Sequence, residues 1–152
     1  MQVFKAPQAQ VLGALQSVAG VVERRQTLPI LSNVLLRKQG ETLELITSDL
    51  EIQIRTTEML GGESATFQTS VGARKMIDIL RSMPADQTVT LESAQGKVVL
   101  KGGKSKFTLQ TLPAEDFPLV QESANFGPAF SVPQKTLKRL LAQVSFAMAV
   151  HD

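Results

Sequence analysis

Two pairs of acidic residues are the part of this sequence that could support acid–base chemistry. Asp49 and Glu51 are two residues apart, and Glu115 and Asp116 are adjacent in a segment bounded by prolines. General acid–base catalysis needs carboxylates in a cleft whose surroundings drive their pKa values apart. No such cleft is indicated here, nor is there a Ser/His/Asp order, a phosphate-binding glycine motif or an HExxH motif. We therefore expect no enzyme, and a small hydrolase built around Asp49 is only a third hypothesis.

Metal and cofactor chemistry find no support in the residue types. The chain has no cysteine and therefore no thiolate nucleophile, disulfide or thiolate metal ligand. His151 is the only histidine, and a lone histidine does not make a metal site. We expect neither a metal ion nor another cofactor.

Basic side chains offer a different chemistry, the binding of phosphate or of acidic surfaces. The net charge is only +2, but residues 37–66 carry three basic and six acidic side chains, whereas residues 74–106 carry seven basic and three acidic ones. Such an uneven distribution favours oriented contact with nucleic acid or with an acidic protein surface. The alternative is that scattered lysines only solubilise strand edges.

The sequence contains three similar segments with helical periodicity, and the helices that they form would hold some of these basic side chains in place. They cover residues 5–18, 70–83 and 131–144. Each opens with Pro or Gly and then repeats apolar residues at about i, i+4 and i+7, as Val11, Leu15 and Val18 do in the first. Proline is well suited to the first turn of a helix, so the pattern predicts three amphipathic helices.

Strand patterns follow the first two helices in the same order. Residues 51–55 and 106–110 alternate between polar and apolar types, as strands with one buried face do. Glycines at 40, 96 and 102–103 mark hairpin turns between the runs. Each repeat therefore reads strand, helix, strand, strand, strand, which predicts an α+β fold; the expected strands are 30–37, 42–48, 50–57, 88–92, 97–101 and 104–110.

A third copy of the unit starts near Phe130 and reaches Asp152 after one strand and one helix. Its helix has an apolar face without strands of its own to cover it, formed by Leu137, Leu140, Leu141, Val144 and Met148. A repeat that cannot bury its face alone stacks on a neighbour. We expect residues 1–125 to form a complete domain and residues 126–152 the truncated start of a second, in a fragment of a longer protein.

Four short stretches resemble the bacterial DNA polymerase sliding clamps, the β subunits, and they occur in the family's order. They are RQTLPIL at residues 25–31, TSDLE at 47–51, ARK at 73–75 and TLPAEDFP at 111–118. The resemblance implies the DNA-clamp fold, in which duplicated β-α-β-β-β units pack two helices on a curved antiparallel sheet. It also implies a ring of two three-domain subunits joined head to tail, with the third domain absent from this chain.

The same resemblance implies a function. The full-length protein is expected to be a non-catalytic processivity factor that encircles duplex DNA non-specifically and tethers the replicative polymerase. Polymerase and clamp-loader subunits would dock in a pocket that lies mostly outside this chain, and the fragment alone would be a monomer. No segment resembles a signal peptide or a membrane span, so we expect a cytoplasmic protein. The rival hypothesis is a protein-interaction scaffold of repeated α+β units without DNA binding.

Two sets of site residues follow from the resemblance. Basic side chains on the helix-lined hole would face DNA, and they are Arg24, Arg25, Arg74, Lys138, Arg139 and His151. An edge strand and the second helix would meet the neighbouring subunit through Lys75, Ile79, Lys104, Lys106, Phe107 and Leu109. Exposed ion pairs contribute only about 0–1 kcal/mol each, so strand pairing and apolar contact must hold the ring while the lysines orient it. The alternative for Phe107 and Leu109 is a place in the core of their own domain.

Overall fold

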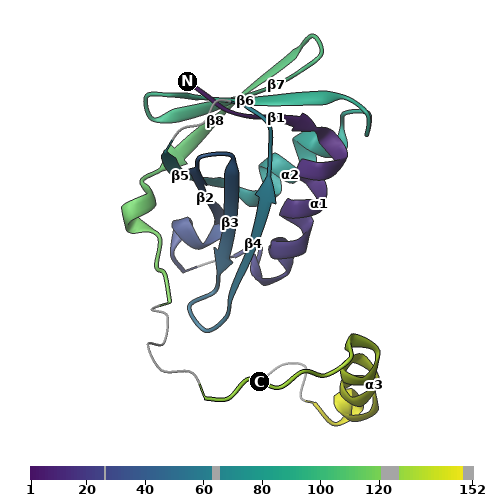
Figure 1. Cartoon of the computed structure of the whole chain (residues 1–152). Coiled ribbons are helices and arrows are strands. Elements are labelled where there is room, and N and C mark those ends of the chain that lie inside the picture. Colours follow the sequence, from purple (N-terminus) through teal and green to yellow (C-terminus); the bar gives the residue numbers. More distant parts are fainter. Residues whose placement is uncertain (26, 63–65, 121–126, 149–152) are drawn as a thin grey trace. The chain divides into compact units, whose positions relative to one another are not determined.

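The computed structural model describes residues 1–25, 27–62, 66–120 and 127–148. The chain divides into two compact units, residues 1–120 and residues 121–152. Within the described residues the first unit holds a curved sheet with the helices α1 and α2, and the second holds the helix α3 (Figure 1).

The first unit contains the same series of elements twice. The strand–helix–strand–strand–strand repeat predicted from the sequence is confirmed in both copies. The first copy is β1 (Gln2–Pro7), α1 (Gln8–Val18), β2 (Asn33–Gln39), β3 (Thr42–Ser48) and β4 (Gln53–Met59). The second is β5 (Phe67–Gly72), α2 (Ala73–Arg81), β6 (Thr88–Ala94), β7 (Lys97–Gly102) and β8 (Ser105–Leu112).

The two copies exchange their first strands. The sheet order is β1-β6-β7-β8-β5-β2-β3-β4, and every neighbouring pair is antiparallel. β1 thus pairs with β6 of the second copy, and β5 pairs with β2 of the first. The two four-stranded halves join between β5 and β8, where only Ser70 with Leu112 and Val71 with Thr111 are paired.

The two edge strands of the sheet, β1 and β4, approach each other just after the end of β4. The backbone N–H of Lys5 on β1 donates to the carbonyl of Gly61 over 2.8 Å. A Cβ atom at Gly61 would lie 2.8 Å from the carbonyl oxygen of Lys5, so the close approach requires glycine. The buried Lys38 of β2 donates its Nζ to the carbonyl of Val3 on β1. The sheet is therefore curved, and its concave side is called the inner side here.

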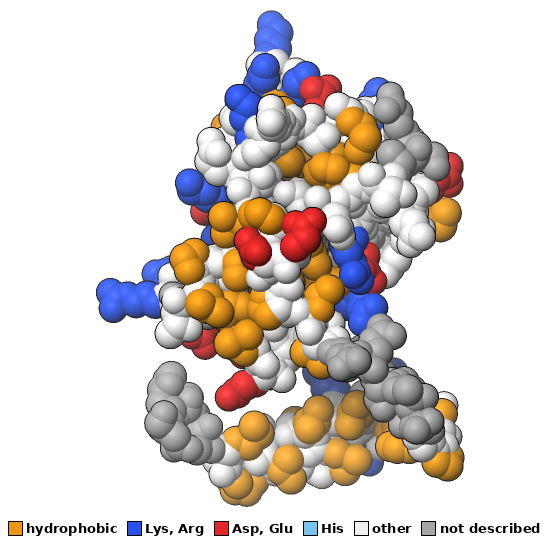
Figure 2. All heavy atoms as spheres, turned by 90° about the vertical axis from the view of Figure 1, so that its left-hand side faces the viewer, with side chains coloured by type: hydrophobic (Ala, Val, Ile, Leu, Met, Phe, Trp, Pro, Cys, Tyr) orange, Lys and Arg blue, Asp and Glu red, His pale blue; other side chains and the backbone are white. Residues whose placement is uncertain are grey.

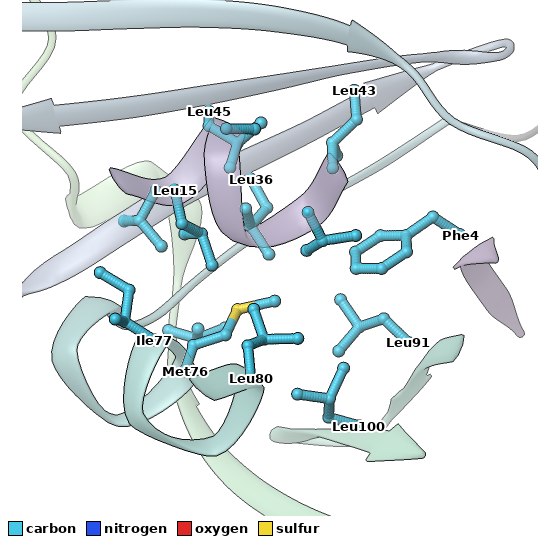
Figure 3. Packing of buried hydrophobic residues seen from close by; sticks show 14 of the residues in the cluster. Phe4, Leu15, Leu36, Leu43, Leu45, Met76, Ile77, Leu80, Leu91 and Leu100 are labelled. Atoms are coloured by element: carbon cyan, nitrogen blue, oxygen red, sulfur yellow. The ribbon is translucent and has the colours of Figure 1, made fainter. Parts of the chain in front are cut away.

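The two helices lie side by side on that inner side (Figure 1). Leu15 of α1 and Leu80 of α2 are fully buried, and they share one core with side chains from both halves of the sheet (Figure 3). The buried Gln8, at the start of α1, donates its Nε2 to the carbonyl of Leu80 over 2.6 Å. The core and this hydrogen bond hold α1 and α2 as one helical layer.

A smaller apolar cluster lies apart from the main core. It consists of Ile30, Leu35, Ile46 and Phe117, with Ala114 packed against it. Figure 2 looks onto the side of the first unit that bears the short 3₁₀ helix Ala114–Asp116, and it shows hydrophobic side chains gathered there. None of the residues predicted to contact DNA or a second subunit belongs to this cluster.

The second unit contains the helix predicted after Pro133. It is α3 (Gln134–Val144), and none of its residues is buried. The strand that was expected before this helix, from near Phe130, is not formed, and no strand is described elsewhere in this unit. In the described part of the chain, no helix is long and apolar enough to cross a membrane.

Candidate nucleic-acid and subunit interfaces

A basic hollow lies on the outward side of the helical layer, which is the side that faces away from the sheet. Its volume is about 730 Å³, and its lining includes Arg24, Arg74, Asp78 and Arg81. Arg74, Asp78 and Arg81 stand at i, i+4 and i+7 of α2, so they share one face of that helix. The hollow therefore presents three positive charges and one negative charge.

The segment that follows α1 carries Arg24 to the surface of α2. A 3₁₀ turn (Ala19–Val21) follows the helix, and the N–H of Val22 donates to the carbonyl of Ala19 over 3.0 Å. Arg74 then donates its Nη2 to the carbonyl of Val22 over 2.9 Å. This bond ties the guanidinium of Arg74 to the segment that carries Arg24. Arg25 is exposed next to Arg24 but is not part of the lining.

α1 contributes no charge to this surface. Its sequence, QAQVLGALQSV, contains no lysine, arginine, aspartate or glutamate. Positive charge on the helical side of the first unit therefore comes from α2 and from the segment after α1. Arg81 was not among the predicted residues, although its position seven residues after Arg74 on an amphipathic helix is a signal that could have identified it.

The remaining predicted DNA-facing residues belong to the second unit. Lys138 and Arg139 are exposed on α3, and with Lys135 they stand at i, i+3 and i+4, which places the three charges on one face. His151 lies outside the described residues.

One side of β8 is open along most of the strand. Residues 105–110 pair with β7 on one side, whereas pairing with β5 on the other begins only at Thr111. Within the described residues, no strand lies against the outer side of Ser105–Gln110. Such an edge exposes backbone N–H and C=O groups that can pair with another strand.

The β7–β8 turn fixes which backbone groups face outward. The two-residue turn Gly103-Lys104 is closed by the pair Gly102 and Ser105, and Gly103 has a φ of +58°, as the first residue of a type II′ turn requires. In an antiparallel pair, alternate residues direct their N–H and C=O away from the partner strand. Counting from Ser105, the outward groups belong to Lys106, Thr108 and Gln110.

The predicted interface side chains differ in exposure. Leu109 is only 6% exposed and belongs to the main core, so the core alternative holds for this residue. Phe107 and Ile79 are half-buried and pack against the same core, which leaves part of each accessible. Lys104 and Lys106 are exposed beside them.

Lys75 lies on α2 at the rim of a second hollow beside the open edge. This hollow of about 340 Å³ is also lined by Gly72 and by residues 108–112 of β8. Arg74 and Asp78 face the basic hollow, and Lys75 and Ile79 are the residues that directly follow them. α2 therefore presents one face to the basic hollow and a neighbouring face to the open edge of β8.

The acidic turn at Asp49 is structural. Its Oδ1 accepts hydrogen bonds from the backbone N–H groups of Glu51 at 2.9 Å and Ile52 at 2.7 Å, and Leu50 has a φ of +81°. The expectation of a strand from Leu50 was therefore wrong, because this turn delays β4 until Gln53. The N–H donors of Ile52 and Glu51 hold the pKa of Asp49 below its ordinary value, which is opposite to what a general acid needs.

The lowered pKa of Asp49 predicts a pH dependence of stability. Because the folded-state pKa is below the unfolded-state value of about 3.9, this carboxylate stabilises the fold fully above that pH. The contribution is lost as the pH falls through the folded-state pKa. We expect the difference in unfolding free energy between the wild type and Asp49→Asn to be constant from neutral pH to about pH 5 and to change only below about pH 4. Urea unfolding at several pH values measures this, and a change confined to neutral pH would contradict it.

The second acidic pair lies on the surface. Glu115 and Asp116 are exposed within the short 3₁₀ helix Ala114–Asp116. In the described part of the chain, no group of three or more His, Cys, Asp and Glu side chains could hold a metal ion.

Comparisons with known proteins agree on one family. The N-terminal domain of the DNA polymerase III beta subunit matches residues 2–121. The beta sliding clamp of Pseudomonas aeruginosa (strain PAO1) is 45% identical over 152 residues, which cover 98% of this chain and 40% of that protein. That of Escherichia coli (strain K12) is 36% identical over 149 residues, covering 98% and 40%.

Solved structures give the same result. The crystal structure of the DNA polymerase III subunit beta from Pseudomonas aeruginosa matches with a TM-score of 0.88 and 42% identity, covering 100% of this chain and 40% of that one. The Caulobacter crescentus beta sliding clamp matches with a TM-score of 0.91 and 32% identity, covering 99% and 40%. The present chain thus spans about 40% of the length of the relatives that it matches.

Proposed function

We propose a role in DNA replication from one premise: this chain belongs to the DNA polymerase III beta subunit family. The proposed role is that of a sliding clamp, a ring that surrounds duplex DNA and keeps the replicative polymerase on its template. The chain would supply one part of that ring, with residues 1–125 as its first domain and residues 126–152 as the start of the second.

The proposal rests on one observation: in this member of the family, the helices form one layer and the strands form another. α1 and α2 form one layer with Arg24, Arg74 and Arg81 on its outward side, and the strands form the other layer. We assign the helical layer to the hole of the ring, with Arg25 beside the hollow and with Lys138, Arg139 and His151 contributed by the second unit. Arginine contacts to phosphates carry no sequence information, so the duplex would be held without preference for sequence.

The open edge of β8 supports a head-to-tail dimer. A strand of the neighbouring subunit would pair with the outward groups of Lys106, Thr108 and Gln110, as in other cases of strand addition. Phe107 and Ile79 would give apolar contact, and Leu109 would support the edge from the core. Lys75, Lys104 and Lys106 would set the orientation of an acidic partner surface.

This chain would catalyse no reaction of its own. The carboxylate of the turn at Asp49 shapes the backbone, as its hydrogen bonds from the N–H groups of Glu51 and Ile52 indicate. Polymerase and clamp-loader subunits would be partners of the assembled ring. Since a ring of this kind acts on chromosomal DNA, we place the protein in the cytoplasm.

The test is topological. This chain replaces the matched segment of the Pseudomonas aeruginosa clamp, and the chimaera is loaded onto nicked circular DNA and onto the same DNA after linearisation. We expect the chimaera to remain on the circle at moderate salt and to be lost from the linear form, because closure rather than affinity retains it. The 152-residue chain alone should be monomeric and should remain on neither DNA.

The parent clamp is the control for loading, and a melting curve establishes that the chimaera folds. Equal retention of a folded chimaera on circular and linear DNA would contradict a clamp. Failure of the folded chimaera to load, with normal dimerisation, would favour the scaffold without DNA binding.

A further inference from the structure

We propose that Asp78 limits how tightly the helical layer holds a DNA phosphate. This inference rests on the proposed function and assigns a role to the one acidic side chain in the basic hollow. Asp78 would keep the duplex weakly bound and therefore free to move through the ring.

The position of Asp78 places its charge among the arginines. It follows Arg74 by four residues and precedes Arg81 by three, and all three line the hollow together with Arg24. Residues at these spacings are neighbours on a helix surface, with Cβ atoms about 5–6 Å apart. A phosphate that approaches Arg74 or Arg81 therefore also approaches a carboxylate.

The carboxylate is not neutralised by a partner. Asp78 is exposed, and the ion pairs among the described residues involve Arg37, Arg55 and Lys101 as the cations. Arg74 directs its Nη2 to the carbonyl of Val22 instead. The negative charge of Asp78 thus remains available to repel a phosphate.

The size of the repulsion suits a moving contact. Two unit charges about 5 Å apart in a water-like medium interact by an energy equivalent to roughly a fourfold change in affinity. Each phosphate that a protein neutralises adds about 0.9 to the slope of log K against log salt concentration. Removing Asp78 should therefore strengthen binding moderately and make it more sensitive to salt.

Two other roles for Asp78 make different predictions. If it only adds to the net surface charge, any exposed carboxylate will have the same effect on DNA binding. If it orients Arg74 and Arg81 by pairing with them, its removal will weaken binding. Only repulsion of the phosphate predicts a gain specific to this position.

The experiment measures binding of the 152-residue chain to a fluorescent duplex of arbitrary sequence by anisotropy at several low salt concentrations. We expect Asp78→Asn to bind about 3- to 10-fold more tightly than the wild type at the lowest salt. The log–log salt slope should steepen by up to about 0.9. Asp78→Glu, which keeps the charge, should stay close to the wild type.

Asp86→Asn is the matched control. Asp86 is exposed in the turn after α2 and is not part of the lining, and its substitution changes the net charge by the same amount. A gain from Asp86→Asn equal to that from Asp78→Asn, or a loss from Asp78→Asn, would contradict the inference while leaving the clamp proposal intact. If neither the wild type nor Asp78→Asn binds duplex even at the lowest salt, the inference is wrong, because it requires a measurable contact between the hollow and a phosphate. The clamp proposal is then still decided by retention of the chimaera on circular DNA. Melting curves of each variant exclude unfolding as the cause.

Discussion

A proline at position 108 should weaken dimerisation of a clamp ring by about 10- to 100-fold while the subunit remains folded. The N–H of Thr108 points away from β7, so its loss does not break the β7–β8 ladder. In the proposed interface that N–H meets a carbonyl of the neighbouring strand. Leaving such an acceptor unsatisfied costs about 1–3 kcal/mol, which corresponds to this range of dissociation constants. Sedimentation of the chimaeric clamp measures the change.

Thr108→Ala is the control for this substitution. It removes the same side chain but keeps the backbone N–H, so we expect its dissociation constant to stay within about twofold of the wild type. Equal weakening by both substitutions would assign the effect to the side chain and remove the support for strand pairing. An unchanged dimer in Thr108→Pro would place the interface elsewhere.

Leu80→Ala should lower the free energy of unfolding of this chain by about 2–5 kcal/mol. Leu80 is fully buried in a core that it shares with residues of α1 and of both halves of the sheet, so truncation leaves a cavity that the surroundings fill only in part. Leu28→Ala, at a position that is 46% exposed, should change the stability by less than about 0.5 kcal/mol. Denaturant unfolding followed by circular dichroism measures both.

The same variant tests whether the two repeats fold as one unit. Leu80 belongs to the second repeat, yet the core that it joins includes side chains of β2 and β3 from the first repeat. We expect hydrogen exchange in β3 and in β7 to accelerate together in Leu80→Ala, since both strands depend on one core. Acceleration confined to β6, β7 and β8 would indicate two independent cores.

Periodicity in the sequence was sufficient to predict the elements but not their pairing. The apolar spacing of Val11, Leu15 and Val18 predicted α1, and the run at Thr42–Ser48 was predicted with the bounds of β3. The exchange of β1 and β5 could not be predicted, because an alternating pattern specifies the buried face of a strand and not its neighbour. The expected start of the fourth strand at Leu50 was wrong because the alternation of residues 51–55 was extended into the turn at Asp49.

For the candidate sites, too, the sequence pattern could not predict which side chains are buried and which are exposed. Phe107 and Leu109 point to one side of β8, so alternation alone could not separate them. Leu109 pairs with Val98 in the middle of the β7–β8 hairpin and is buried, whereas Phe107 lies nearer the turn. Arg24 and Arg74 were predicted by resemblance, but the hydrogen bond from Arg74 to the carbonyl of Val22, near Arg24 in the chain, could not be read from the sequence.

The exchange of first strands also determines when a growing polypeptide can close its structure. Phe4 of β1 pairs with Leu91 of β6, so β1 leaves the ribosome well before the strand with which it pairs has been translated. Val3 and Phe4, which are buried in the finished fold, lack this partner until then, and we expect pairing between strands so far apart in the sequence to slow folding. An ancestral gene that encoded a single repeat with this pairing could have completed its sheet only by trading strands between two copies. Tandem fusion of two such genes turns that encounter between molecules into an event within one chain.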